Sequence, residues 1–232
     1  MSTVRALRTA YLAAGAVSVV AAAAGRRGDR LTRIVKPTLM PLLAGTVLAG
    51  DRAKDRKSTA TVVAGLAGGW VGDIILMGAD GRSDDPRTRA RNLNRGSAAF
   101  ALNQVAYIAE LSRAGHRPRK STVALRAPVL ASGVVTAATG APAALPAAVG
   151  YGSLLAGTSV LAADEGETTP LGLGGNLFVL SDGLILARQA FLTGEKPVVR
   201  VLDGLVDGLV MATYVAAQLL LVEGLTGEPT RG

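Results

Sequence analysis

The feature that most constrains this chain is a series of apolar stretches, each close to the length that crosses a lipid bilayer. A helix needs about 20 apolar residues to cross a hydrocarbon layer of about 30 Å. Eight such stretches are separated by charged or Gly/Pro-rich breaks: 7–24, 36–50, 59–77, 95–111, 123–140, 142–163, 171–192 and 201–221. The sequence therefore predicts one all-α integral membrane domain over residues 1–232, a transmembrane bundle of about eight spans.

The composition supports a membrane protein and argues against a soluble domain. Hydrophobic residues make up 49% of the chain, charged residues 18%, and the mean hydropathy is +0.36. The first stretch has the apolar core of a signal peptide, but Arg26 and Arg27 occupy the region where a cleavage site requires small neutral residues. We therefore expect a retained first helix, and a bacterial plasma membrane as the location.

Several classes of function are disfavoured by the residue types. The chain has no cysteine, and its single histidine, His116, lies in a basic loop. No metal site and no cofactor are therefore expected. The net charge of +8 comes from short loops between apolar spans, with 3% aromatic residues. This pattern favours contact with anionic lipid headgroups over nucleic acid.

Two aspartates lie inside apolar spans, in similar surroundings. Asp73 and Asp182 each follow a small residue and precede an apolar run, and they are 109 positions apart. A parallel repeat of four plus four spans and chance similarity both account for this likeness. With eight spans, the third and seventh helices run in the same direction. Both carboxylates would then lie roughly 10 Å inside the same membrane face, across one cavity.

An ionisable side chain within the bilayer costs at least a few kcal/mol, so it is retained chiefly where it faces a partner or a cavity. We therefore predict that Asp73 and Asp182 are the catalytic residues. The alternative is that each only caps or hydrogen-bonds a neighbouring helix.

Other polar residues within or near the spans are candidates for binding substrate. Lys36 opens the second stretch and would pair with a carboxylate or a lipid phosphate, or reach the interface as a snorkelling lysine. Asp203 and Asp207 share one helix face; they are expected in the headgroup layer, and the alternative is that they join the polar cavity. The neutral candidates for a polar interior are Asn103, Gln104, Tyr107, Tyr151, Asn176, Ser181, Tyr214 and Gln218.

An ordered set of short motifs resembles the YhhN-like family of membrane proteins, the lysoplasmalogenases. The matching pieces are Lys36-Pro37 with Met40-Pro41-Leu42-Leu43, Gly72-Asp73 with Leu76-Met77, Phe100 with Tyr107, Tyr151-Gly152, Phe178 with Ser181-Asp182, and Tyr214 with Gln218. The resemblance implies an eight-helix membrane enzyme that hydrolyses the vinyl ether bond of lysoplasmalogens. The products would be a fatty aldehyde and glycerophospho-ethanolamine or glycerophospho-choline. The family commonly has histidine three residues before the tyrosine of the fourth span, where this chain has Gln104.

The chemistry of the two acids agrees with that implied reaction. Vinyl ether hydrolysis begins with protonation of the β-carbon and continues with attack of water on an oxocarbenium ion. It needs one group to donate a proton and another to orient water. Two carboxylates sharing a poorly solvated cavity cannot both ionise easily, so one would hold the proton. A proton- or cation-coupled transporter using the same aspartates, and a scaffold without chemistry, are the alternatives.

Overall fold

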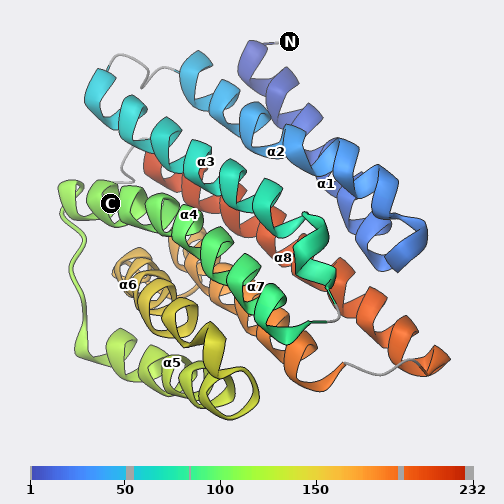
Figure 1. Ribbon diagram of the computed structural model, residues 1–232. Coiled ribbons are helices and arrows are strands. Elements are labelled where there is room, and N and C mark those ends of the chain that lie inside the picture. The colour runs from blue at the N-terminus through green and yellow to red at the C-terminus, as the bar shows by residue number, and fades with distance from the viewer. Residues whose placement is uncertain (1, 51–54, 84, 193–195, 228–232) are drawn as a thin grey trace.

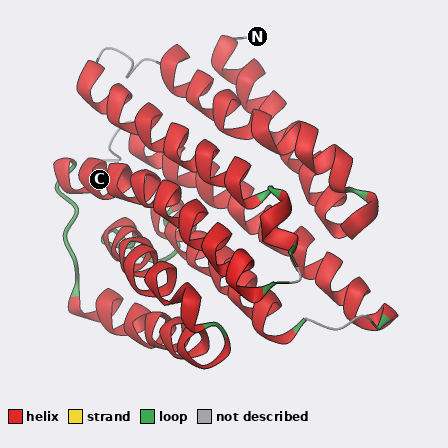
Figure 2. Cartoon of the chain, viewed as in Figure 1, coloured by secondary structure: helices red, strands yellow, loops and turns green. Residues whose placement is uncertain are grey.

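The computed structural model describes residues 2–50, 55–83, 85–192 and 196–227, and these residues form helices and no strand. The predicted all-α fold is confirmed (Figures 1 and 2). The α-helices are α1 (Thr3–Ala23), α2 (Asp29–Ala49), α3 (Arg56–Leu76), α4 (Pro86–Arg113), α5 (Lys120–Gly140), α6 (Gly152–Ala162), α7 (Pro170–Phe191) and α8 (Pro197–Thr226). Each of the eight predicted stretches coincides largely with helical residues.

Helix α2 is longer than the predicted stretch at its N-terminal end, and two prolines do not interrupt it. It begins at Asp29 and continues through Pro37 and Pro41. Proline has no N–H, so Pro41 leaves the carbonyl of Pro37 without its helical partner. The Trp70 indole Nε1–H, from α3, donates to that carbonyl at 2.9 Å. Lys36 therefore lies inside the helix rather than at its first residue.

Helix α4 also begins earlier than predicted, at Pro86 rather than residue 95. The Asp85 carboxylate accepts hydrogen bonds from the backbone N–H groups of Arg87 and Thr88, at 3.1 and 3.0 Å. An aspartate N-cap followed by proline in the first turn is a strong helix start. The first turns of α4 are rich in arginine, so a search for apolar stretches overlooked them.

The sixth predicted stretch is not one regular helix. It begins with a 3-10 turn (Pro142–Ala144), passes through a π-helical turn (Ala147–Tyr151) and then becomes α6. The Asn94 side chain holds this entry, since its Nδ2 donates to the Ala143 carbonyl at 2.8 Å and its Oδ1 accepts from the Ala147 N–H at 3.2 Å. The wider π turn alters the direction of the side chains that follow. Tyr151 is its last residue.

The helices run roughly along a common direction, with α1 and α2 at one edge of the bundle and α5 at the other (Figure 1). Consecutive helices pack on one another except at α4, which packs on α3 and α6 rather than on α5, and α8 returns to pack against α1 as well as α7. In α5 the buried residues are Thr122, Arg126 and Ala137. Helix α5 is therefore the least enclosed part of the bundle.

Five helices, α1, α3, α5, α7 and α8, are long and apolar enough to cross a membrane. Large apolar side chains on their outer faces are exposed, including Val20, Leu125 and Leu205. The interior, in contrast, buries polar groups such as Asn103, Gln104 and Gln218, each 0% exposed. An apolar outside around a partly polar inside is the arrangement expected in lipid.

Helices α3 and α4 approach closely along a row of glycines on α3. A Cβ atom at Gly65 would lie 2.6 Å from Ala106 Cβ, and one at Gly72 would lie 2.5 Å from Phe100 Cδ2. These distances are too short for carbon atoms, so only glycine permits this separation of the two backbones. Close approach through small residues is a main source of helix association in membranes, where apolar burial between helices gains little.

We predict that Gly65→Ala lowers the free energy of unfolding by about 1–3 kcal/mol, because the added methyl group has no space against Ala106. Thermal unfolding in detergent measures the change. Gly140→Ala is the matched control, since nothing lies within 4 Å of a Cβ atom at Gly140. Equal shifts of Tm in the two variants would contradict the packing argument.

Candidate functional site

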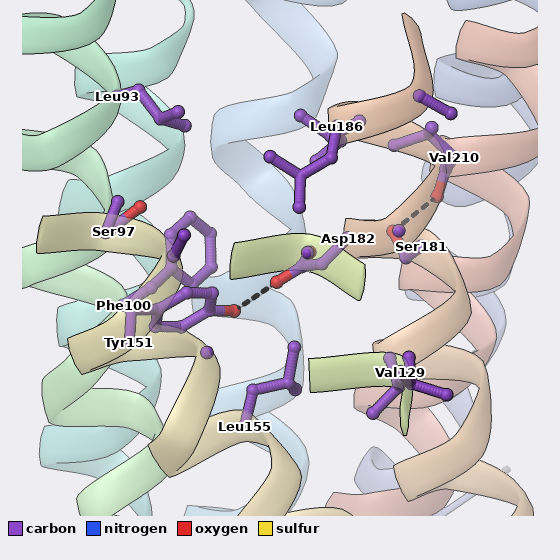
Figure 3. A pocket seen from close by; sticks show the side chains of 18 of the residues that line it. Leu93, Ser97, Phe100, Val129, Tyr151, Leu155, Ser181, Asp182, Leu186 and Val210 are labelled. Carbon is purple, nitrogen blue, oxygen red and sulfur yellow. Dashed lines mark hydrogen bonds between the residues drawn. The ribbon is translucent and has the colours of Figure 1, made fainter. Parts of the chain in front are cut away.

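A cavity of about 330 Å³ lies among the helices, with walls from α2 through α8. Most side chains on its wall are apolar, such as Leu93, Leu155 and Leu186 (Figure 3). Four charged residues interrupt this apolar surface: Lys36, Asp73, Arg126 and Asp182. A mainly apolar cavity with a few converging polar groups is the usual form of a small-molecule site.

Asp73 is the most constrained of the charged groups. Its Oδ1 lies 2.9 Å from Lys36 Nζ, and its Oδ2 accepts a hydrogen bond from the Tyr214 hydroxyl at 2.8 Å. The Asp73 side chain is 2% exposed and that of Lys36 is 16% exposed. A buried charge is tolerable only when paired and hydrogen-bonded, and here both carboxylate oxygens have partners, from α2 and α8.

The Tyr214 ring is fixed by aromatic neighbours. It makes edge contacts with Phe100 and Phe178, with ring centroids 6.1 and 5.7 Å apart. Lys36 Nζ lies 5.6 Å from the Tyr214 centroid, within the range of a cation–π contact. The hydroxyl that binds Asp73 is therefore held in place by α4 and α7 together.

Asp182 lies on α7 and has a different kind of partner. The Tyr151 hydroxyl donates to its Oδ2 at 2.5 Å, and Figure 3 shows the two side chains pointing toward one another across the cavity. Tyr151 is the last residue of the π turn and packs on Phe100, with ring centroids 6.3 Å apart. Within the described part of the chain, no cation forms an ion pair with Asp182.

The two aspartates line the same cavity, as their positions on the third and seventh helices led us to expect. That they divide one proton between them stays a prediction. Asp73 binds Lys36 and Tyr214, while Asp182 binds Tyr151, and no hydrogen bond joins the two carboxyl groups in the described structure. Each acid has a separate environment.

Of the nine residues predicted to bind substrate, Lys36, Tyr151, Ser181 and Tyr214 lie on the cavity wall. Ser181 also ties two helices together, since its hydroxyl donates to the Val210 carbonyl at 3.1 Å.

The other five are not part of the cavity wall, and their role in binding substrate stays a prediction: Asn103, Gln104, Tyr107, Asn176 and Gln218. The Tyr107 hydroxyl donates to Gln218 Oε1 at 2.5 Å, and Gln218 Nε2 donates to Asn103 Oδ1 at 3.4 Å. These three therefore join α4 to α8 instead of facing the cavity.

Gln104 occupies the position where the resemblance implies histidine. Its side chain is 0% exposed, and within the described residues neither its Nε2 nor its Oε1 has a hydrogen-bond partner. An amide cannot transfer a proton as an imidazole can, so at this position the chain retains a polar group without acid–base function.

Charged residues elsewhere form separate clusters. Arg188 on α7 binds Asp203 at 2.9 Å and also Asp207, both on α8. The two aspartates expected among lipid headgroups are thus ion-paired to another helix. Among the described residues, no group of three or more His, Cys, Asp or Glu side chains could hold a metal ion.

Sequence reasoning missed Arg126 and the positioning role of Phe178. Arg126 is 5% exposed and lines the cavity, although it lies within a stretch predicted as a span. Arg126 is a single cation three residues into the apolar segment 123–140. The cost of burying a charge within a span, which singled out the two aspartates, would have identified it as well.

These features together define a polytopic α-helical integral membrane protein with a mainly apolar, internally charged cavity. Within that class, the chain belongs to the YhhN family, whose model matches residues 31–225 and so covers all of α3 to α7 and most of α2 and α8. The predicted family membership is confirmed. Comparisons with curated proteins and with solved structures found no match.

We predict that Lys36→Met destabilises the protein by about 3–5 kcal/mol, because it leaves the Asp73 carboxylate buried without its cation. Adding Asp73→Asn should restore much of this loss, since the double variant buries no unpaired charge. Chemical unfolding in detergent measures both. As a control, Arg8→Met breaks the exposed Arg8–Glu223 ion pair and should cost at most about 1 kcal/mol. A double variant no more stable than Lys36→Met would contradict this view of the pair.

Proposed function

We propose that this protein is an intramembrane lipid hydrolase that cleaves the vinyl ether bond of a lysoplasmalogen or a related lysolipid. The observation that carries the proposal is the placement of two carboxyl groups, with different partners, on the wall of one mainly apolar cavity. The family gives independent support, because the YhhN family includes lysoplasmalogenases.

The reaction needs one proton donor and one group that activates water. A proton added to the β-carbon of the vinyl ether produces an oxocarbenium ion. Water then adds to the adjacent carbon and loses a proton, which gives a hemiacetal. The hemiacetal collapses when its hydroxyl proton moves to the ether oxygen. The products are a fatty aldehyde and a glycerophospho-alcohol, and one water is consumed.

The environments of the two aspartates suit different roles. Asp182 contacts a neutral hydroxyl and forms no ion pair among the described residues, so its uncharged form costs less in an apolar wall. We assign it as the proton donor. Asp73 is held as a carboxylate by Lys36, so we assign it to orient the attacking water and accept its proton. Return of that proton to Asp182 would complete the cycle.

The position of the cavity suits a substrate that enters from the bilayer. Helix α5 forms one wall and is largely exposed on its outer side. A lysolipid could therefore reach the carboxyl groups without leaving the membrane. A bacterial plasma membrane, with basic loops in contact with anionic headgroups, completes this proposal.

We predict that Asp182→Asn and Asp73→Asn each lower hydrolysis of lysoplasmenyl-ethanolamine by a factor on the order of 10² or more, since each removes one of the two proton-transfer groups. Release of fatty aldehyde by purified protein in detergent measures this, with and without EDTA. Asp85→Asn is the matched control, because asparagine preserves the exposed helix cap. Full activity in both site variants would exclude this mechanism. Proton flux into liposomes without hydrolysis would favour a transporter instead.

We also predict that Tyr151→Phe lowers kcat roughly tenfold or more with a small effect on KM, because it removes the hydroxyl that orients Asp182. Tyr11→Phe is the matched control. The Tyr11 hydroxyl is also buried, but it donates to the Val215 carbonyl, away from the cavity. If the two variants lost activity equally, the effect would be one of stability rather than orientation.

A further inference from the structure

Arg126 is a buried cation for which the proposed mechanism has no use. Its side chain is 6% exposed and belongs to α5, the least enclosed helix. Its Nε donates to Ser159 at 3.1 Å, and Nη1 and Nη2 donate to the two carboxylate oxygens of Glu167 at 2.5 Å each. Nη2 also donates to Asn176 Oδ1 at 2.5 Å. In the described structure these contacts use four of the five guanidinium N–H groups.

Arg126 lies on the wall of the cavity that holds the two aspartates. Figure 3 shows Val129, one turn further along α5, on one side of Asp182, and Leu186 on the other side. The cavity wall thus includes an arginine as well as the two carboxyl groups, among apolar side chains.

Glu167 is not on the cavity wall, but it binds Arg126 and supplies a matched negative charge that can reach water. It lies in the loop between α6 and α7, and its side chain is 37% exposed. The hydrogen bond from Arg126 lowers the pKa of the Glu167 carboxyl below its ordinary value, so this group is ionised at neutral pH. Arg126 and Glu167 therefore present one cation and one anion side by side, with no net charge.

We propose that Arg126 and Glu167 bind the zwitterionic headgroup of the lysolipid, with the phosphate on Arg126 and the ammonium group on Glu167. This inference rests on the proposed function. Arginine is well suited to the phosphate, because its planar N–H groups match phosphate oxygens in pairs. When the ligand binds, its ammonium group replaces part of the contact that Glu167 makes with Arg126. The number of contacts between opposite charges stays the same.

The spacing along α7 fits such a substrate. Asn176, which binds Arg126, lies six residues before Asp182, or about 9 Å along the helix axis. Five bonds separate the sn-1 oxygen of a glycerophospholipid from its phosphorus, a reach of roughly 6 Å. A guanidinium hydrogen bond to phosphate adds about 3 Å. A phosphate on Arg126 therefore places the vinyl ether beside Asp182 and directs the alkyl chain toward Leu186.

Binding of ligands without a vinyl ether tests this site separately from the chemistry. Acyl lysophosphatidylethanolamine and monoacylglycerol of the same chain length are titrated against detergent-purified protein. Arg126→Gln and Arg126→Lys should weaken binding of the phospholipid by about tenfold or more and leave binding of the monoacylglycerol unchanged. Arg8→Gln, which breaks an exposed ion pair elsewhere, is the control and should change neither.

Glu167→Gln supplies a second test at a more exposed position. It should weaken binding of lysophosphatidylethanolamine and leave binding of lysophosphatidic acid, which has no ammonium group, unchanged or tighter. Equal loss of both ligands in the Arg126 variants, with a lowered Tm, would mean that Arg126 only braces α5 and would overturn the proposal. Unchanged binding in the Arg126 or Glu167 variants would also overturn it. If wild type binds as expected but releases no aldehyde, the proposed hydrolysis fails and the headgroup site stands.

Discussion

The ion pair between Lys36 and Asp73 is the interaction on which the rest of this interior depends. A carboxylate that is 2% exposed in an apolar bundle is stable only with a cation and hydrogen-bond donors from other segments. Lys36 comes from α2 and Tyr214 from α8, so one carboxylate fixes three helices relative to one another. The same pair converts two isolated charges into a neutral unit, which leaves Asp182 as the carboxyl group without an ion pair on this cavity.

Two local departures from regular helix geometry bring these side chains into place. Helix α2 tolerates two prolines near Lys36, because Trp70 takes up the Pro37 carbonyl that Pro41 leaves free. The π turn that ends at Tyr151 is held at its entry by Asn94. Both irregularities adjoin residues that bind the aspartates. Irregular helix geometry is common at functional sites, since it directs side chains where a regular helix cannot.

The number and order of the helices followed from the sequence, because apolar length is a local property that lipid imposes on each span separately. The importance of Asp73 and Asp182 followed from the same cost of burying charge. The same reasoning could not predict which polar side chains contact one another. In the sequence, nothing distinguishes the polar residues Asn103, Tyr107 and Gln218 from Tyr151 and Tyr214. The rotation of α4 and α8 about their axes places the first three in the interface between these two helices. That rotation depends on packing partners far away in the sequence, including the glycine row that sets α3 against α4.

Arg126 shows how one side chain serves both packing and recognition. Few residues of α5 are buried, so its attachment to α6 and α7 relies strongly on the contacts of this guanidinium with Ser159, Asn176 and Glu167. An apolar residue would pack α5 at least as well, since a buried ion pair is often no more stabilising than hydrophobic contacts of the same volume. The charge is better explained by what it offers to the cavity. The wall that holds the two carboxyl groups thus also offers a cation suited to the phosphate of a lysolipid, and apolar side chains suited to its alkyl chain.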